Sequence, residues 1–337
     1  MKHVLIASVI VTGLWTATAF GQAKAPDWVQ VTDHAAWKAR DSQGEWVFKD
    51  QLWIIGGWYD SFHSPPRDVW SSSDGKEWKM VQADAPMKHS DLAMTIAFKD
   101  KMWFMGGWYN GRLPDHSASN EVWSSSDGVA WQQVTSHADW TPRIAAGIVV
   151  FKDKLWILGG CEDYYFGTEK NLKNDVWSSS DAEHWKLETA DAGWAPRGYH
   201  QAVVLGDKIY VMGGGNYQPK YVVYNDVWSS SDGVHWQQET ANAPWPGRIW
   251  FSSVVYRDRM WVLGGWTNNP SKNWDDVWYS KNGKDWSQLT SEVIWKERHE
   301  HSAFVLHDKI WVAGGMNPPL NNDVWSLDVP ANWFSNK

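Results

Sequence analysis

Short apolar runs recur along the chain at a regular spacing, and the same turn residues bound each run. In one complete unit, from residue 197 to residue 245, four segments have the length and apolar content of β-strands. These segments cover residues 200–205, 209–212, 226–231 and 235–240. A tight hairpin turn joins the first two segments at Gly206-Asp207-Lys208, and a second joins the last two at Asp232-Gly233. The unit therefore predicts one antiparallel sheet of four short strands.

The unit occurs six times. Val-Trp pairs mark its third strand with a period of 47 to 54 residues, at Val69-Trp70, Val122-Trp123, Val176-Trp177, Val227-Trp228, Val277-Trp278 and Val324-Trp325. Glycine pairs end its second strand, at Gly56-Gly57, Gly106-Gly107, Gly159-Gly160, Gly213-Gly214, Gly264-Gly265 and Gly314-Gly315. Four strands per unit of about 50 residues are typical of propeller blades. We therefore expect an all-β, six-bladed β-propeller.

The N-terminal segment predicts how the ring closes. Residues 28–40 (WVQVTDHAAWKAR) match residues 131–143 (WQQVTSHADWTPR) in phase, so the chain starts with the fourth strand of a blade. We expect this strand to complete the blade whose first three strands lie between residues 300 and 327, which removes a sheet edge. The segment around Trp333 is the alternative for that position.

The first 23 residues resemble a secretory signal peptide, because Lys2 precedes an apolar run over 4–15 and small residues lead to Ala23. The run is too short to predict a membrane span. We expect an exported monomer, periplasmic or secreted, with a single domain over 24–337. Cys161 is the only cysteine, so no internal disulfide is expected. The net charge of -8 argues against nucleic acid as a partner.

The apolar strand, the glycine pair and a tryptophan some twenty residues later, as in KIYVMGG followed by Trp236, resemble kelch repeats. The resemblance covers almost the whole chain after residue 23 and implies a kelch-type propeller. At the level of fold, the chain is similar to exported bacterial-type kelch proteins of the galactose oxidase-like and N-acetylneuraminate epimerase-like superfamily. This likeness implies a sugar-modifying enzyme, such as a sialic-acid epimerase or mutarotase, as one candidate.

The connections after the glycine pairs vary in length and are rich in aromatic residues, including Trp58, Trp108 and Trp266. Long variable loops on a rigid scaffold often carry binding sites. Two interpretations stay open: the rings pack the loops against each other, or they form a platform on which carbohydrate stacks.

A basic residue precedes each first strand and an acid precedes each third strand. The basic residues are Arg40, Lys88, Arg143, Arg197, Arg248 and Arg298, and the acids are Asp68, Glu121, Asp175, Asp226, Asp276 and Asp323. Each basic side chain could cross the glycine pair to bind the acid of its own blade. Alternatively Arg143, Arg197, Arg248 and Arg298 could bind an acidic ligand, because guanidinium groups hold oxyanions in a bidentate fork.

The blades differ most just after the basic residue, where Asp91, Tyr199-His200, Trp250 and His299-Glu300-His301 concentrate chemistry. If Asp91, His200 and His301 share one repeat position, they could converge as a metal site. We nevertheless expect no metal or other cofactor. The enzyme alternative uses Glu300, His301, His200 and Tyr199 as catalytic groups in acid-base chemistry.

The leading hypothesis is an exported kelch propeller that binds a carbohydrate, including one with an acidic group, on its long-loop face. We expect Asp91, Trp58, Trp108, Trp250, Trp266 and the four arginines to bind the ligand. The alternatives are a sugar-modifying enzyme and a scaffold that docks another protein.

Overall fold

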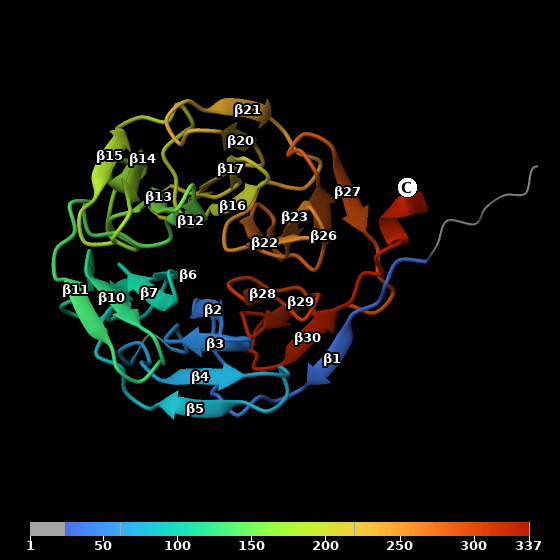
Figure 1. Cartoon of the computed structure of the whole chain (residues 1–337), viewed down its shortest axis with the longest axis horizontal. Helices are drawn as coiled ribbons and strands as arrows, with labels where there is room; N and C mark the ends of the chain where they lie inside the picture. Colours follow the sequence, from blue (N-terminus) through green and yellow to red (C-terminus); the bar gives the residue numbers. More distant parts are fainter. Residues whose placement is uncertain (1–23, 61, 219, 337) are drawn as a thin grey trace, which may run out of the picture.

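The computed structural model describes residues 24–60, 62–218 and 220–336, so the expected signal segment at 1–23 lies outside the described residues. Six four-stranded antiparallel sheets are arranged as a ring around a central axis (Figure 1). This confirms the six-bladed β-propeller. The first strand of each blade lies innermost, next to the axis.

The strands of the first three blades are β2 (Gly44–Phe48), β3 (Gln51–Ile55), β4 (Val69–Ser72) and β5 (Lys79–Gln82); β6 (Met94–Phe98), β7 (Lys101–Met105), β10 (Val122–Ser125) and β11 (Gln132–Thr135); and β12 (Gly147–Phe151), β13 (Lys154–Cys161), β14 (Leu172–Ser179) and β15 (Lys186–Thr189). The next two blades hold β16 (Gln201–Leu205), β17 (Lys208–Met212), β20 (Val227–Ser230) and β21 (Gln237–Thr240); and β22 (Ser252–Tyr256), β23 (Arg259–Leu263), β26 (Val277–Ser280) and β27 (Trp286–Leu289).

The sixth blade contains both ends of the repeat. Its strands are β28 (Ser302–Leu306), β29 (Lys309–Ala313), β30 (Val324–Leu327) and the N-terminal β1 (Val29–Thr32). Val29 pairs with Ser326 and Thr32 with Val324, which confirms the predicted closure. Trp333 instead begins the short 3-10 helix η2 (Trp333–Asn336). Pairing with β1 removes the outer edge that β30 would otherwise expose.

Apolar side chains from neighbouring blades form the core. Each of the six interfaces between blades has its own buried cluster; the one between the first and sixth blades, for example, packs Trp37 and Ile54 against Trp311. Tryptophans that follow the fourth strands, such as Trp194 and Trp245, are 1% and 0% exposed. The many tryptophans of the repeat therefore hold blade to blade.

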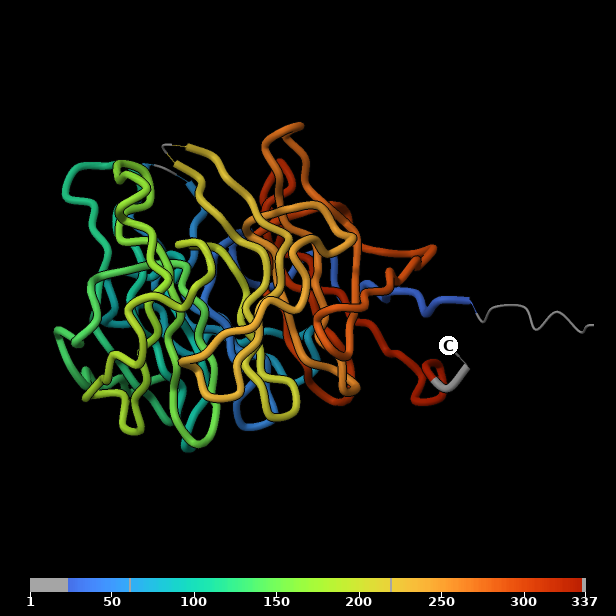
Figure 2. Tube along the Cα trace, turned by 90° about the horizontal axis from the view of Figure 1, so that it is seen from above, coloured from blue at the N-terminus to red at the C-terminus, as the bar shows by residue number. Residues whose placement is uncertain are grey.

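The two faces of the ring differ. The long connections after the glycine pairs project from one face, and tight hairpin turns occupy the other (Figure 2). The long connections form three two-stranded sheets, β8 (Trp108–Tyr109) with β9 (Ser117–Ala118), β18 (Gly215–Asn216) with β19 (Val222–Val223), and β24 (Trp266–Asn268) with β25 (Ser271–Asn273), and the 3-10 helix η1 (Glu169–Asn171). Within the described residues, no helix combines the length and apolar content needed to cross a membrane.

Candidate functional site

Six residues with left-handed backbone conformation surround the axis, one ahead of each first strand. They have φ between 49° and 59° and are Ser42, Leu92, Ala145, Tyr199, Trp250 and Glu300. Backbone hydrogen bonds join them around the axis: Ser42 N–H donates to Glu300 O, Leu92 to Ser42, Ala145 to Leu92, Tyr199 to Ala145, and Glu300 to Trp250. Non-glycine residues adopt this conformation at a cost of about 1–3 kcal/mol each and cluster at functional sites. We call these six residues the axial ring.

Below the axial ring, a cavity of ≈ 570 Å³ runs along the axis between the first strands. Two further layers of side chains line it. The layer nearer the axial ring is Glu45, Thr95, Ile148, Ala202, Ser253 and Ala303, and the next is Val47, Ala97, Val150, Val204, Val255 and Val305. Among the described residues that line the cavity there is no lysine or arginine. The volume falls in the range of about 300–1,000 Å³ common for ligand pockets.

Aromatic residues of the long loops cover the axial ring on the other side. This aromatic cluster contains Trp108, Tyr164, Tyr165, Tyr217 and Trp266 from the loops, packed against Tyr199 and Trp250 of the axial ring. The rings of Tyr164 and Tyr165 stack at 3.9 Å, and those of Tyr217 and Trp250 lie 4.7 Å apart. Trp108 is only 1% exposed and Trp250 8%. Trp108 therefore packs the loops against each other, which is the first of the two interpretations left open for the loop aromatics, and Trp250 packs in the same cluster.

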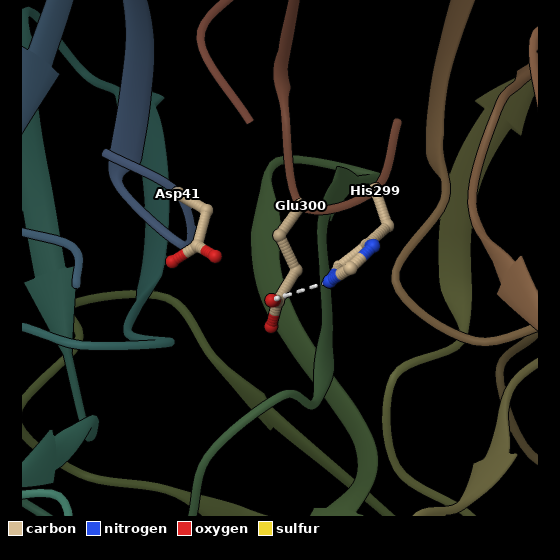
Figure 3. A group of neighbouring side chains, drawn as sticks. All are labelled: Asp41, His299 and Glu300. Carbon is tan, nitrogen blue, oxygen red and sulfur yellow. Dashed lines mark ion pairs between the residues drawn. The ribbon is translucent and has the colours of Figure 1, made fainter. Parts of the chain in front are cut away.

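Three buried carboxyl groups and one imidazole gather beside the axial ring. One ligand atom each from Asp41, His299 and Glu300 lies within 4.8 Å of the others (Figure 3). The Ser42 hydroxyl donates to Asp41 Oδ1 at 3.3 Å and also lies against the carboxyl groups of Asp91 and Glu300. We call Asp41, Asp91, His299 and Glu300 the acidic cluster.

Burial sets the protonation of the acidic cluster. Burial, followed by the negative charge of Asp91, raises the pKa of Asp41 well above its usual range. Burial, followed by the charges of Asp41 and Asp91, raises the pKa of Glu300 well above its usual range. Burial also raises the pKa of Asp91 to about 7 and lowers the pKa of His299 to about 3. At neutral pH, Asp41 and Glu300 therefore hold their protons, Asp91 is about half ionised, and the His299 imidazole is uncharged.

One hydrogen bond orients His299. Its Nδ1 lies 2.6 Å from Oδ1 of Asn273, the last residue of β25. An amide oxygen only accepts, so Nδ1 carries the proton and Nε2 presents a lone pair. Nε2 faces Glu300 Oε2 at 3.6 Å, and the ring stacks on Trp250 at 5.1 Å.

The two histidines expected to be catalytic lie between blades. His200 Nε2 accepts a hydrogen bond from Gly147 N–H at 3.2 Å, and its ring packs on Trp194. His301 packs on Trp295 at 5.3 Å. The structure does bring Tyr199, Trp250 and Glu300 together at the axial ring. Burial lowers the pKa of His200 to about 3 and the pKa of His301 well below its usual range, so both are uncharged packing residues at neutral pH.

The predicted equivalence of Asp91 with His200 and His301 is wrong. Asp91 forms a backbone bridge to Trp108 as Asp41 does to Trp58 and His299 to Met316. Asp91 is therefore equivalent to Asp41 and His299, and Ala93 to the two histidines. The trio considered for a metal does not form one group in the described part of the chain, whereas Asp41, His299 and Glu300 do.

Five arginines form the ion pairs expected within their own blades. Arg197 Nη1 and Nη2 donate to the two carboxylate oxygens of Asp226 at 2.5 and 2.9 Å, and Nη1 also donates to Gly213 O. The other pairs are Arg40–Asp68, Arg143–Asp175, Arg248–Asp276 and Arg298–Asp323. Because their guanidinium groups are buried and their donors are used, the expected ligand contacts of Arg143, Arg197, Arg248 and Arg298 are wrong.

The second blade departs from this scheme. By the bridge register, Ser90 takes the arginine position, and its hydroxyl donates to Pro66 O at 2.6 Å. Lys88 lies over the Tyr109 ring at 4.8 Å, and Glu121 accepts from Trp123 Nε1. The predicted Lys88–Glu121 pair is absent among the described residues.

Sequence reasoning missed two members of the site. Asp41 directly follows the basic residue of the first blade, in the segment where the blades differ most, but other residues of that segment were selected from the sequence. Asn273 carries no local signal, because its role comes from a loop of the fifth blade that reaches His299 in the sixth. Trp58 pairs through its backbone with Asp41 and is not among the residues of the aromatic cluster.

Comparison with known proteins identifies the family of the chain. The model of the KLHDC2/KLHL20/DRC7 Kelch-repeats domain matches residues 164–336, about half of the 337-residue chain. Among solved structures, that of YjhT superposes with a TM-score of 0.68 over 87% of this chain and 95% of that one, at 14% identity, which is a likeness of fold.

Two curated relatives share part of the chain. The flagellar outer arm dynein alpha chain of Chlamydomonas reinhardtii is 27% identical over 42% of this chain. The leucine-zipper-like transcriptional regulator 1 homolog of Drosophila melanogaster is 26% identical over 37% of it. The matched segments span only 3% and 13% of those proteins. On the match of its second half and the six-bladed architecture, the chain belongs to the KLHDC2/KLHL20/DRC7 Kelch-repeats domain family.

Proposed function

We propose that the protein binds a small neutral carbohydrate in its axial cavity. The kelch propeller fold supports a role in ligand binding or as an interaction scaffold. The observation that favours a carbohydrate is the lining of the cavity, which combines the polar residues Glu45, Thr95 and Ser253 with the aromatic residues Tyr199 and Trp250. Sugar hydroxyls need both donors and acceptors, and the apolar face of a sugar packs on aromatic rings.

The charge of the lining favours a neutral ligand over an acidic one. No arginine or lysine among the described residues lines the cavity, and the five buried arginines are paired with aspartates. Burial raises the pKa of Glu45 to about 7, so this group exchanges between donor and acceptor near neutral pH. A carboxylate on the ligand would find no basic side chain among the described residues of the lining to pair with.

A cavity-filling substitution tests the site. Purified protein is screened on an array of neutral and sialylated glycans, and a hit is measured by calorimetry. Ala202→Trp and, on another strand, Ala97→Phe place a large side chain inside the cavity and should abolish binding. Phe166→Ala, on the loop face at 54% exposure, should leave binding unchanged. Thermal melts verify that each variant folds.

The opposite pattern would overturn the proposal. Binding that survives both cavity-filling variants but is lost in Phe166→Ala places the ligand on the outer loop face. A preference for sialylated glycans would refute the neutral ligand. Absence of binding to every glycan, with a protein partner recovered through the loop face, would favour the interaction scaffold.

The contact between Glu300 and His299 favours a second candidate, a sugar mutarotase at the same cavity. The Glu300 carboxyl group would give its proton to the ring oxygen while His299 Nε2 takes the proton of the anomeric hydroxyl. The bond between the anomeric carbon and the ring oxygen breaks, an aldehyde forms, and the reverse steps close the ring on the other face. Nuclear magnetic resonance of anomer exchange tests this: Glu300→Gln should keep binding and lose rate enhancement, whereas full activity in Glu300→Gln would exclude it.

We also propose that the protein is exported. The apolar run over residues 4–15 and the small residues up to Ala23 support this. Expression of the whole chain in a bacterium, followed by fractionation and mass spectrometry, should find a processed chain that starts near residue 24 outside the cytoplasm. A full-length chain confined to the cytoplasm would refute export.

A further inference from the structure

The acidic cluster concentrates ligand atoms in a very small volume. Asp41, His299 and Glu300 each direct one oxygen or nitrogen to within 4.8 Å of the other two (Figure 3). Ligands about 2.0–2.3 Å from one metal ion lie within roughly this separation of each other. The three side chains come from the loops before β2 and β28, which the closure of the ring brings side by side.

No positive side chain balances these carboxyl groups in the described part of the chain. Each neighbouring arginine is held by its own aspartate, as Arg40 is by Asp68 and Arg298 by Asp323. Among the residues that the structure describes, the sole ion-pair partner of Glu300 is the imidazole of His299. Asp41 and Asp91 form no ion pair among the described residues. Burying several carboxyl groups together costs free energy unless a cation or protons compensate.

Two buried oxygens of the cluster lack a hydrogen-bond partner among the described residues. They are Oδ1 of Asp91, a residue 2% exposed, and Oε1 of Glu300, whose side chain is 7% exposed. Both carboxyl groups lie against the hydroxyl of Ser42, so they face a common volume. Buried polar atoms of native proteins nearly always have a partner, so these two oxygens have the capacity to bind a ligand that enters this volume.

The imidazole is prepared to bind a metal. Asn273 Oδ1 accepts from Nδ1 of His299, so the Nε2 lone pair points into the cluster. Metal-ligating histidines commonly donate their other N–H to a carbonyl or carboxylate oxygen in this way, which fixes the tautomer and the ring orientation. Stacking on Trp250 holds the ring from its face.

We propose that Asp41, His299 and Glu300, with Asp91 beside them, form a binding site for a divalent transition-metal ion at the loop-side end of the axial cavity. Several carboxylates with one imidazole suit Mn²⁺ and Zn²⁺. Glu300 lines the cavity, so the ion is reached from the space proposed for the carbohydrate. The metal site does not depend on the identity of that ligand. It excludes the mutarotase candidate while the ion is bound, because the ion would occupy Nε2 of His299 and keep the Glu300 carboxyl group ionised.

The test uses the purified chain after treatment with chelator and dialysis. Mn²⁺ and Zn²⁺ are titrated separately by calorimetry, and bound metal is counted by plasma mass spectrometry. Wild type should bind one ion per chain with micromolar or tighter affinity and should melt at a higher temperature with the ion. Asp41→Asn combined with Glu300→Gln should lose about 100-fold or more in affinity.

Matched variants show whether metal binding depends on the acidic cluster or on other acids and histidines of the chain. Glu45→Gln removes another buried acid of the same cavity and should bind within about threefold of wild type. The double variant keeps side-chain shape and removes buried acid, so without metal it should melt at or above the wild-type temperature. Wild type that binds neither ion would overturn the proposal. A double variant that binds as tightly as wild type, or loss of binding on removal of the exposed His63, would also overturn it.

Discussion

Asn273 Oδ1 lies 2.6 Å from His299 Nδ1, so a loop of the fifth blade decides which ring nitrogen of the sixth blade faces Glu300. Asn273→Ala removes this acceptor and frees the other tautomer. We expect the affinity for Mn²⁺ or Zn²⁺ to fall about 10–100-fold, as when the outer partner of a ligating histidine is lost. Asn273→Asp retains an acceptor and should bind within a few-fold of wild type. Equal affinities of Asn273→Ala and wild type would show that this contact does not orient the ring.

The Arg197–Asp226 pair is buried, with side chains 0% and 12% exposed, so removing one partner should affect stability strongly. Asp226→Asn leaves a buried guanidinium group without its counter-charge and removes an acceptor of Trp228 Nε1. We expect the free energy of unfolding to fall by about 3–5 kcal/mol in chemical denaturation.

The Lys186–Glu188 pair is the control for this prediction, since its basic side chain is 73% exposed although its acid is 9% exposed. Lys186→Gln should change the free energy of unfolding by less than about 1 kcal/mol. Similar losses for Asp226→Asn and Lys186→Gln would contradict the structural role of the buried pair.

Ring closure makes Trp28 important for stability. Trp28 is 2% exposed, meets the Trp295 ring edge-on at 5.9 Å, and precedes the strand β1 that pairs with β30. Trp28→Ala should destabilise the whole propeller by about 3–5 kcal/mol, measured by the denaturation midpoint. The adjacent Val29 is 61% exposed, so Val29→Ala should cost under about 0.5 kcal/mol. A negligible effect of Trp28→Ala would mean that the N-terminal strand is dispensable.

Glu45 makes stability depend on pH. Burial raises its pKa to about 7 from the ordinary value of 4.5, so the folded protein holds this proton more tightly than the unfolded chain. This contribution to stability is complete below about pH 4.5 and is lost as pH rises through about 7, a change of about 3 kcal/mol.

Glu45→Gln replaces this carboxyl group by an amide that cannot ionise. The variant therefore tests the predicted fall in stability with rising pH. Compared with wild type, it should be more stable at pH 8 by up to about 3 kcal/mol, with the difference shrinking toward pH 4. Urea denaturation of both proteins at several pH values measures this. A stability difference that does not vary with pH would show that Glu45 titrates normally.

Much of the scaffold could be predicted because its determinants are local. The glycine pairs, the Asp-Gly turns and the apolar strands act between residues that are near in sequence, and each blade repeats them. Even the closure by β1 was visible, since residues 28–40 match 131–143 in phase. The arginine pairs followed from the absence of side chains at the glycine pair that each guanidinium crosses.

The error in the second blade shows the limit of comparing residue types. Lys88 is the basic residue that precedes the first strand of the second blade in the sequence. The backbone bridge between Asp91 and Trp108 sets the alignment of this blade with the others, and in that alignment Ser90 takes the arginine position. A shift of two residues moved Asp91 to the wrong place in the comparison. Backbone hydrogen bonds decide register, and the residue types of the second blade did not reveal them.

The sequence by itself determined the six blades, their order and the strand that closes them, because these depend on a periodic pattern of apolar residues and turns. Only the tertiary structure decided where chemistry gathers. Asp41 and Glu300 lie near opposite ends of the chain and meet because the ring closes, and Asn273 joins them through a loop whose path no local pattern specifies. Burial at that meeting point then sets the protonation and the binding capacity of side chains that would be ordinary acids and bases in water.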